Sequence, residues 1–446
     1  MTGNLVTAAF QHDLSRAKDP QLHTHVIVMN MTERSDGQWR AISNEEVVKK
    51  ILADLRADDG RVWEEQKKLT EIPAPPYKEA VRAQYMLKRF KEAGLKDAYI
   101  DSEGNVMALR KGGGGPKLVV SAHMDTVFAE GTDVKVKEIE GRFHAPGISD
   151  DARGLVALLS VISTMNANAV RTVGDVLFMA TVGEEELGNL RGVKALFRDH
   201  KDIDGFISID GTAIDRVTNT AAGSHRYEVV FKGPGGHSFR HFGLPSAIQA
   251  MGRAVAKISD LETPTLPKTT FTVGTVRGGT SVNAIAGEAR IGVDMRSSDN
   301  NELAKIDAKI QAAVKEGVAE ENRRWPASAV HTSNQITTET KLIGDRPAGG
   351  TPADAKIVQA YRRSVGAVGR EVKTMSDGST DSNIAMSLGV PAVTIGGGGE
   401  SDGQHSLREW YKPTDAYLGP QSIFLTLLGL TGLEGVSRPL LEKRAR

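Results

Sequence analysis

The chain has no cysteine among its 446 residues and no net charge, since 56 Lys and Arg balance 56 Asp and Glu. The lack of cysteine excludes disulfides, zinc fingers and thiol nucleophiles, so any metal ion must be held by His, Asp and Glu. The charge balance removes a global electrostatic argument for binding nucleic acid or a membrane surface. The sequence also lacks an apolar run of about 18 residues, which excludes a membrane-spanning helix.

A secretion signal has a basic start followed by an apolar stretch, and the first 30 residues have no such pattern. We therefore expect a cytoplasmic protein. This expectation leaves open an export signal lost when the N-terminal segment described below was joined to the chain.

Glycine is abundant, with 47 residues and GGGG clusters at 112–115 and 396–399. Such loops favour an α/β enzyme over a helical bundle. Apolar periodicity predicts helices over 45–69, 78–94, 151–165, 189–199 and 355–369, and short apolar runs predict buried strands in KLVVSA, DVLFMATV, GFISID and PAVTIGGGG. Their alternation predicts an α/β fold, a mostly parallel sheet flanked by helices.

The pattern changes between residues 224 and 344. RYEVVFKG, TTFTVGTVRG and ARIGVDMRS read as alternating strands, with helical stretches near 244–258 and 300–320. We expect an inserted α+β sandwich here, and a discontinuous catalytic domain formed by residues 45–223 and 345–446.

Five metal-binding side chains follow the predicted strands or lie near the C-terminus: His123, Asp150, Glu186, Asp210 and His405. Ligands of an open α/β sheet bind at the carboxyl ends of its strands, where these residues can converge. Taken singly, each histidine can be a structural residue and the GEEE run a solvated loop. As a set, two imidazoles and three carboxylates can hold two divalent ions, with one carboxylate bridging them.

This pattern resembles a known family. HxD after a strand, DDxxG at 150–154, an acidic pair before x-Gly, Asp210 and the distal His405 are similar to the co-catalytic di-zinc peptidases, which include carboxypeptidase G, tripeptidase T, dimeric dipeptidases and aminoacylase. The resemblance covers about residues 46 to 436 and implies two Zn²⁺, with Mn²⁺ or Co²⁺ as alternatives. It places His123 and Asp210 on one ion, Glu186 and His405 on the other, and Asp150 between them.

The same resemblance assigns catalytic roles. Glu185 is the expected general base, because adjacent side chains of an extended loop point different ways and Glu186 is taken as a ligand. Asp125 is expected to hydrogen-bond the far nitrogen of His123. The family also implies a cis peptide after Asp150.

The inserted domain is expected to contribute further groups. His237, in KGPGGHSFRHFG, would stabilise the oxyanion in the partner subunit of a homodimer. Asn283 and Arg296 would bind a substrate carboxylate, which suits the forked donors of arginine. A surface turn for His237 and an ion pair between Arg296 and Asp294 are the structural alternatives.

Residues 4 to 44 resemble a different family, the conjugative relaxases, which nick plasmid DNA with a tyrosine and a three-histidine metal site. His12, His23 and His25 match the three ligand positions, but Tyr77 is the first tyrosine of the chain. About 40 residues also cannot build a core. We interpret residues 1–44 as a non-functional relaxase-like fragment, left by a gene fusion or a misplaced gene start.

These observations lead to three alternative hypotheses for the function. The first is a di-zinc hydrolase that cleaves small peptides as a tripeptidase or other exopeptidase, with an N-acyl amino acid deacylase or a carboxypeptidase of the same family as alternatives. It would act as a homodimer through the inserted domain, without nucleic acid or membrane partners. The second is DNA nicking by the N-terminal histidines, and the third is a non-enzymatic peptide-binding protein.

Overall fold

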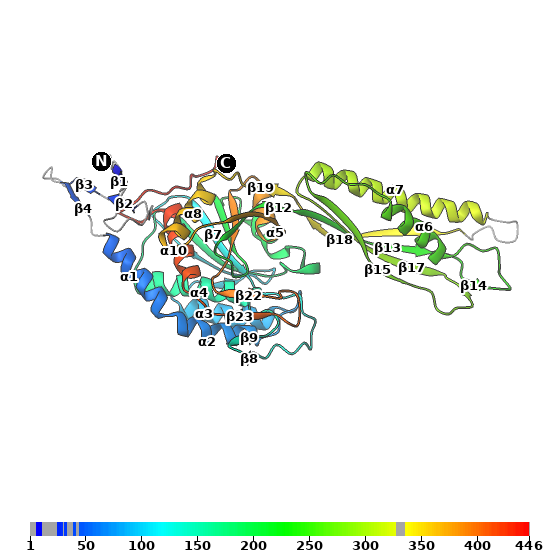
Figure 1. Cartoon of the computed structure of the whole chain (residues 1–446), viewed down its shortest axis with the longest axis horizontal. Helices are drawn as coiled ribbons and strands as arrows, with labels where there is room; N and C mark the ends of the chain where they lie inside the picture. Colours follow the sequence, from blue (N-terminus) through cyan, green and yellow to red (C-terminus); the bar gives the residue numbers. More distant parts are fainter. Residues whose placement is uncertain are drawn as a thin grey trace, which may run out of the picture.

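The computed structural model describes residues 44–326 and 335–445, with side chains from residue 47 on. Nearer the N-terminus it describes only the backbone of β1 (Val6–Phe10), β2 (His25–Met29), β3 (Met31–Glu33) and β4 (Trp39–Ala41). His12, His23 and the side chain of His25 lie outside the described residues, so the expected three-histidine site does too. The remaining chain forms two bodies that give the molecule an elongated shape (Figure 1).

The larger body is built on a nine-stranded sheet in the order β19-β12-β21-β11-β7-β10-β6-β5, with β20 beside β12. Its strands are β5 (Tyr99–Ile100), β6 (Val106–Arg110), β7 (Lys117–His123), β10 (Asp175–Thr181), β11 (Gly205–Ile209), β12 (Arg216–Ala221), β19 (Gly349–Gly350), β20 (Thr374–Gly378) and β21 (Ala392–Ile395). The four middle strands, β21, β11, β7 and β10, are parallel. Antiparallel pairs flank them, because β6 pairs with β10 and β12 with β21. The α/β class is confirmed, and the parallel part is the centre of a mixed sheet.

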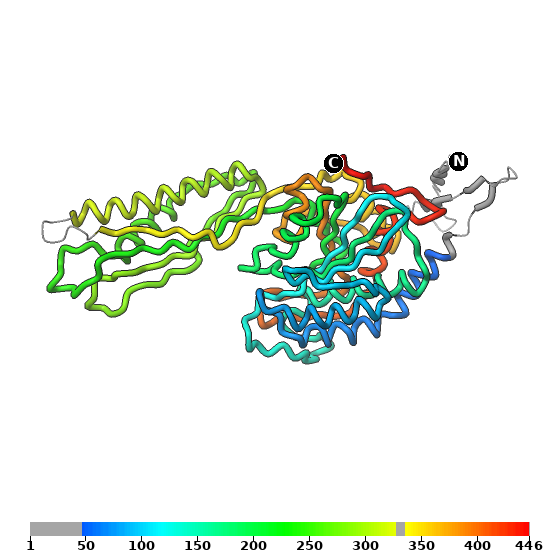
Figure 2. Tube along the Cα trace, turned by 180° about the vertical axis from the view of Figure 1, so that it is seen from behind, coloured from blue at the N-terminus to red at the C-terminus, as the bar shows by residue number. Residues whose placement is uncertain are grey.

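Helices cover both faces of this sheet (Figures 1 and 2). One face packs against α1 (Asn44–Ala57), α2 (Asp59–Thr70), α3 (Ala80–Glu92), α4 (Ala152–Ala167), α8 (Lys356–Ala367) and α10 (Leu418–Thr431). The other packs against α5 (Arg191–Asp199) and α9 (Ser382–Ser387). Leu118 and Val120 of β7 enter the first core and Val119 the second. Burial on both faces explains why this strand is mostly apolar and does not alternate with exposed polar residues.

The predicted helix over 45–69 is two helices, α1 and α2, that meet at Asp58. Gly60, a weak helix former, follows the break, and Arg61 pairs with the Asp58 carboxylate. The helix predicted over 78–94 ends as expected, since Gly94 has φ +99.

The smaller body is a four-stranded antiparallel sheet in the order β15-β17-β13-β18. Its strands are β13 (Gly223–Lys232), β15 (Thr269–Gly278), β17 (Glu288–Ser297) and β18 (Thr337–Arg346). Helices α6 (Ala247–Ser259) and α7 (Asn300–Arg324) pack on it around a separate core. A short pair, β14 (Gly236–His237) with β16 (Ala284–Ile285), lies at its outer end (Figure 1). We call residues 223–346 the second domain.

A small antiparallel sheet beside the larger body supports the loop that carries His405. It has the order β22-β23-β9-β8, formed by β8 (Lys137–Ile139), β9 (Arg142–His144), β22 (Glu400–Asp402) and β23 (Trp410–Lys412). Tyr411 of β23 is buried with Ile148, and Trp63 of α2 packs against them. Among the described helices, none is long and apolar enough to cross a membrane.

Candidate metal centre

Three neighbouring parallel strands end at one edge of the central sheet, and each carries candidate ligands. His123 is the last residue of β7, the three glutamates 184–186 follow β10, and Asp210 follows β11. The parallel direction puts all three strand ends at the same edge, where ligands of open α/β sheets bind. The predicted convergence therefore follows from the strand order.

The side chains of His123, Asp150 and Glu185 meet there, with one ligand atom from each within 4.8 Å of the others. Asp150 lies between two imidazoles, with Oδ1 3.0 Å from His123 Nε2 and Oδ2 3.1 Å from His405 Nε2. His405 Nε2 is also 3.2 Å from Glu185 Oε1. Asp210 lines the same cleft.

Glu186, which the sequence pattern predicted as a ligand, is not a member of this group, although it also lines the cleft. Glu184 and Glu185 are buried, whereas Glu186 is exposed and has φ +40. It starts a short 3-10 turn, η1 (Glu186–Gly188), and this left-handed backbone turns the chain after Glu185. The residue expected to be the base, Glu185, thus occupies the place expected for a ligand.

Asp125 supports both His123 and the glutamate loop. His123 Nδ1 is 3.0 Å from the backbone oxygen of Asp125 and 3.7 Å from Oδ1 of its carboxylate. The two carboxylate oxygens accept hydrogen bonds from the backbone N–H groups of Glu184 and Glu185, at 3.0 and 2.8 Å. Asp125 therefore contacts the far nitrogen of His123 through its backbone oxygen, and its carboxylate fixes the backbone of the loop that carries Glu185.

The chain around Asp150 is held by a second buried carboxylate. The peptide between Asp150 and Asp151 is cis, as the resemblance implied. Glu409 accepts hydrogen bonds from the backbone N–H groups of Gly147, Ser149 and Asp150. Burial raises the pKa of Glu409 to about 7, although these donors favour its charged form. The sequence pattern gave no sign of this residue, which is far from Asp150 along the chain.

The pKa shifts of the histidines and carboxylates show whether this site is suited to metal ions. Burial and the neighbouring Asp150 raise the pKa of Asp210 to about 7. Hydrogen bonds to Asp150 and Glu185 raise the pKa of His405 to about 11, and the pKa of His123 is raised well above its usual value despite burial. Carboxylates thus draw protons onto both imidazoles, where divalent ions would provide the positive charge instead. The donor set of imidazole nitrogens and carboxylate oxygens suits Zn²⁺ and similar ions.

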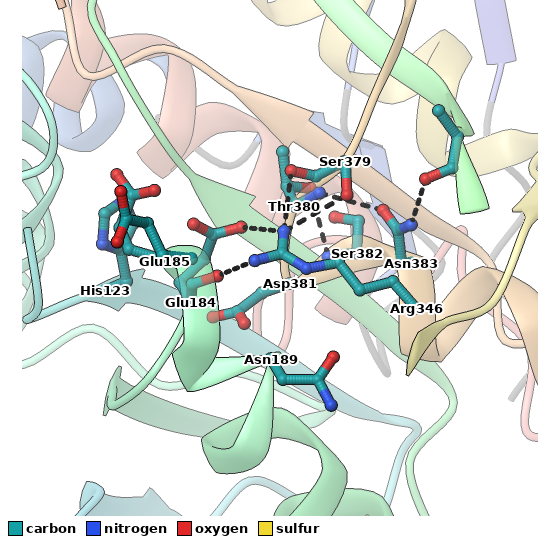
Figure 3. Close-up of polar contacts among 12 residues, drawn as sticks. His123, Glu184, Glu185, Asn189, Arg346, Ser379, Thr380, Asp381, Ser382 and Asn383 are labelled. Carbon is teal, nitrogen blue, oxygen red and sulfur yellow. Dashed lines mark hydrogen bonds and ion pairs between the residues drawn. The ribbon is translucent and has the colours of Figure 1, made fainter. Parts of the chain in front are cut away.

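Arginines form the opposite wall of the cleft, which has a volume of about 520 Å³. Arg346 contacts Glu184, with Nη1 3.3 Å from Oε1 (Figure 3). Arg226 and Arg296 share Asp294, through Nε contacts of 2.8 and 2.9 Å. The ion pair considered as an alternative for Arg296 therefore exists, and the arginine also lines the cleft. Sequence reasoning missed Arg226 and Arg346 because strands of the second domain bring them to the site.

His237 and Asn283 lie elsewhere in this chain. His237 belongs to β14 at the outer end of the second domain, away from the sheet edge that carries His123 (Figure 1). The backbone oxygen of Asn283 accepts a hydrogen bond from Ser238, and both His237 and Asn283 are exposed. Within one chain Asn283 therefore does not join Arg296, which lines the cleft.

Comparison with known proteins separates the two parts of the chain. The first 55 residues match the TrwC relaxase family. TraI, a multifunctional conjugation protein of Escherichia coli, is 55% identical over 49 residues, which is 11% of this chain and only 3% of that protein.

The rest of the chain is similar to metallopeptidases. Carboxypeptidase G2 of Pseudomonas sp. (strain RS-16) is 24% identical over 320 residues, covering 69% of this chain and 71% of that protein. Aminopeptidase PepT from Bacillus cereus has the same fold, with a TM-score of 0.64 and 20% identity over 83% of this chain and 97% of that one. So has YXEP of Bacillus subtilis, a dinuclear metal-binding peptidase, with a TM-score of 0.61 and 15% identity over 84% and 99%. Residues 119–428 match peptidase family M20/M25/M40, and the chain is a member of this family of hydrolases that act on peptide or amide bonds.

Proposed function

We propose that the chain is a two-metal hydrolase that cleaves the amide bond of small peptides or N-acyl amino acids. The observation that carries the proposal is the position of Asp150, whose two carboxylate oxygens face His123 and His405 separately. In this proposal His123 and Asp210 would hold one ion, Glu185 and His405 would hold the other, and Asp150 would be a ligand of both. Zinc is the first choice, with manganese and cobalt as alternatives.

Glu184 is the proposed general base, in place of Glu185. Its side chain is buried, lines the cleft and precedes the ligand Glu185 directly. Burial raises the pKa of Glu184 well above its usual value, while Arg346 opposes this rise. A raised pKa suits a group that must accept a proton and then release it. Only one oxygen of Glu184, Oε1, is engaged by Arg346 Nη1, so the other is left to face a water molecule.

The side chains of the site have separate roles in the proposed reaction. Ions bound at the site would supply Lewis acidity for the substrate carbonyl and make water more acidic. Glu184 accepts a proton from the attacking water and later delivers it to the leaving amine nitrogen. Asp125 keeps Glu184 and Glu185 in place through their backbone N–H groups.

The arginine wall favours a substrate with a free carboxylate. Arg226 and Arg296 together carry two positive charges and share the single carboxylate of Asp294, which leaves one positive charge on that wall. Guanidinium groups suit carboxylate recognition. A short peptide with a free C-terminus and an N-acyl amino acid both meet this requirement. The tripeptidase, carboxypeptidase and deacylase alternatives therefore differ in what the site demands at the other end of the substrate.

The second domain is the proposed lid and dimerisation unit. His237 and Asn283 are exposed at its outer end, where they would enter the cleft of a second chain. His237 of the partner subunit would then donate a hydrogen bond to the oxyanion. Arg296 would act within its own chain.

The test is a kinetic screen of free and N-blocked di- and tripeptides, together with N-acyl amino acids. Chelation should abolish hydrolysis, and zinc or cobalt should restore it. A requirement for a free N-terminus would identify a tripeptidase, whereas turnover of blocked substrates would identify a carboxypeptidase or deacylase. Hydrolysis that is unaffected by complete metal removal would contradict the proposal.

A further inference from the structure

We propose that Arg346 and Arg226, two arginines of the second domain, are positioning residues that hold the loop of Glu184 to Glu186. Through them, the second domain sets the place of the base. The inference rests on the proposed function to the extent that it takes Glu184 as the base.

Arg346 is the last residue of β18, and its side chain is 5% exposed. Its guanidinium donates through Nη1 to Glu184 Oε1 and to Ser379 Oγ, at 3.3 and 3.2 Å, and through Nη2 to the backbone oxygen of Glu184 (Figure 3). One group thus holds both the carboxylate and the backbone of Glu184. The fixed planar fork of a guanidinium suits two separate acceptors better than the compact ammonium of lysine.

Arg226 of β13 holds the other end of the same loop. Its Nη1 donates to the backbone oxygen of Glu186 at 3.0 Å, while its Nε is fixed by Asp294 within the second domain. The backbone N–H of Asp345 adds a further contact, since it donates to Asn189 Oδ1 at 2.9 Å. The second domain therefore forms hydrogen bonds with this loop at Glu184, Glu186 and Asn189.

The two arginines act together because their strands are neighbours. In the register of β13 and β18, Arg346 is opposite Ser224 and Arg226 is opposite Gly344. The backbone N–H groups of both Glu184 and Glu185 are held from within the larger body by Asp125, whereas the carboxylate and backbone oxygen of Glu184 are held by Arg346. A rotation of the second domain would therefore displace the Glu184 carboxylate relative to Glu185, so the hydrolytic geometry depends on the orientation of the second domain.

The direct test is peptide-level hydrogen–deuterium exchange, which needs no activity. Arg346→Ala and Arg226→Ala, each compared with the wild type in metal-free and metal-loaded form, should exchange the amides of residues 183–190 several-fold faster. Arg290→Ala is the matched control, because Arg290 lies on the same sheet and pairs with Glu228 and Glu288 away from the loop. Exchange that is unchanged in both arginine variants would overturn the proposal.

Kinetics supply the second test. Arg346→Ala should lower kcat by about 100-fold, within the range that proton transfer contributes. KM should change by less than about threefold, and the variant should keep two metal ions per chain. Arg346→Lys should recover part of kcat, because one cation remains near Glu184. A raised KM at unchanged kcat would contradict the inference by making Arg346 a substrate-binding residue. If the wild type cleaves no amide, the proposed function fails, and the exchange result alone decides whether the arginines hold the loop.

Discussion

Asp150 directs one carboxylate oxygen at His123 and the other at His405, at 3.0 and 3.1 Å. The imidazoles come from distant parts of the chain, one from the end of β7 and the other from the loop between β22 and β23. A single carboxylate thus joins the two halves of the proposed metal centre.

Asp150→Ala should therefore lose both metal ions, because the only shared ligand of the proposed pair is gone. The measurement is the metal content of purified protein after dialysis, by elemental analysis. Asp133→Ala is a suitable control, since Asp133 is an exposed acid paired with Lys137. Retention of two tightly bound ions by Asp150→Ala would refute the bridging role.

Metal binding should release protons. In the metal-free site hydrogen bonds to Asp150 and Glu185 raise the pKa of His405 to about 11, and the pKa of His123 is raised too, so the neighbouring carboxylates favour protonated imidazoles. Metal ligation requires neutral imidazole, and the protons must leave. Affinity should consequently increase as the pH rises from 5 to 9. Calorimetric titration of zinc in buffers of different ionisation enthalpy measures the number of protons, and a value of zero would contradict this electrostatic account.

Glu409→Gln should weaken metal binding by about 10- to 100-fold without removing a ligand, as changes behind a metal ligand commonly do. The amide would leave only one oxygen to accept from the backbone N–H groups of Gly147, Ser149 and Asp150. Competition with a coloured chelator gives the affinity. Glu400→Gln, an exposed change in β22, should leave it unaltered. Equal affinities for the two variants would argue against the support role of Glu409.

The sequence predicted the fold best where burial leaves a strong pattern. The apolar runs of β7, β10 and β11 were recognised because both of their faces are covered. The antiparallel flanks were missed because strands such as β12 alternate in burial, and their pairing partners lie far away in sequence. The sequence predicted a mostly parallel sheet, and the structure has antiparallel pairs on both sides of its four parallel middle strands.

The site shows a different limit of sequence reasoning. The motif of an acidic pair before x-Gly fits GEEELG only at Glu185 and Glu186, yet the backbone turns at Glu186 and exposes it. Three identical residues in a row carry no signal of which one lies beside His123 and Asp150. Arg226 and Arg346 could not be predicted for another reason. Their contacts with the loop of Glu184 to Glu186 form only when the second domain packs against the larger body.

Deletion of residues 1–43 should leave amide hydrolysis and metal content unchanged. The core of the larger body starts within α1, at Ile51 and Leu55, so the cut removes none of its described packing. Initial rates and metal analysis of the truncated chain test this expectation. Loss of either property would give the segment a role in hydrolysis.

A plasmid assay addresses the relaxase-like segment separately. We expect no nicking of supercoiled DNA by the full chain, since no tyrosine precedes Tyr77. Nicking that disappears with residues 1–43 would instead favour a DNA-processing role for His12, His23 and His25.

The comparison of Glu184→Gln with Glu185→Gln tests the account most directly, by metal content and kcat measured on the same preparations. We predict that Glu184→Gln retains two ions per chain and loses at least about 100-fold in kcat, as expected for a general base, whereas Glu185→Gln loses one of the ions. The reverse result, with metal lost from Glu184→Gln and retained by Glu185→Gln, would contradict the assignment of base and ligand.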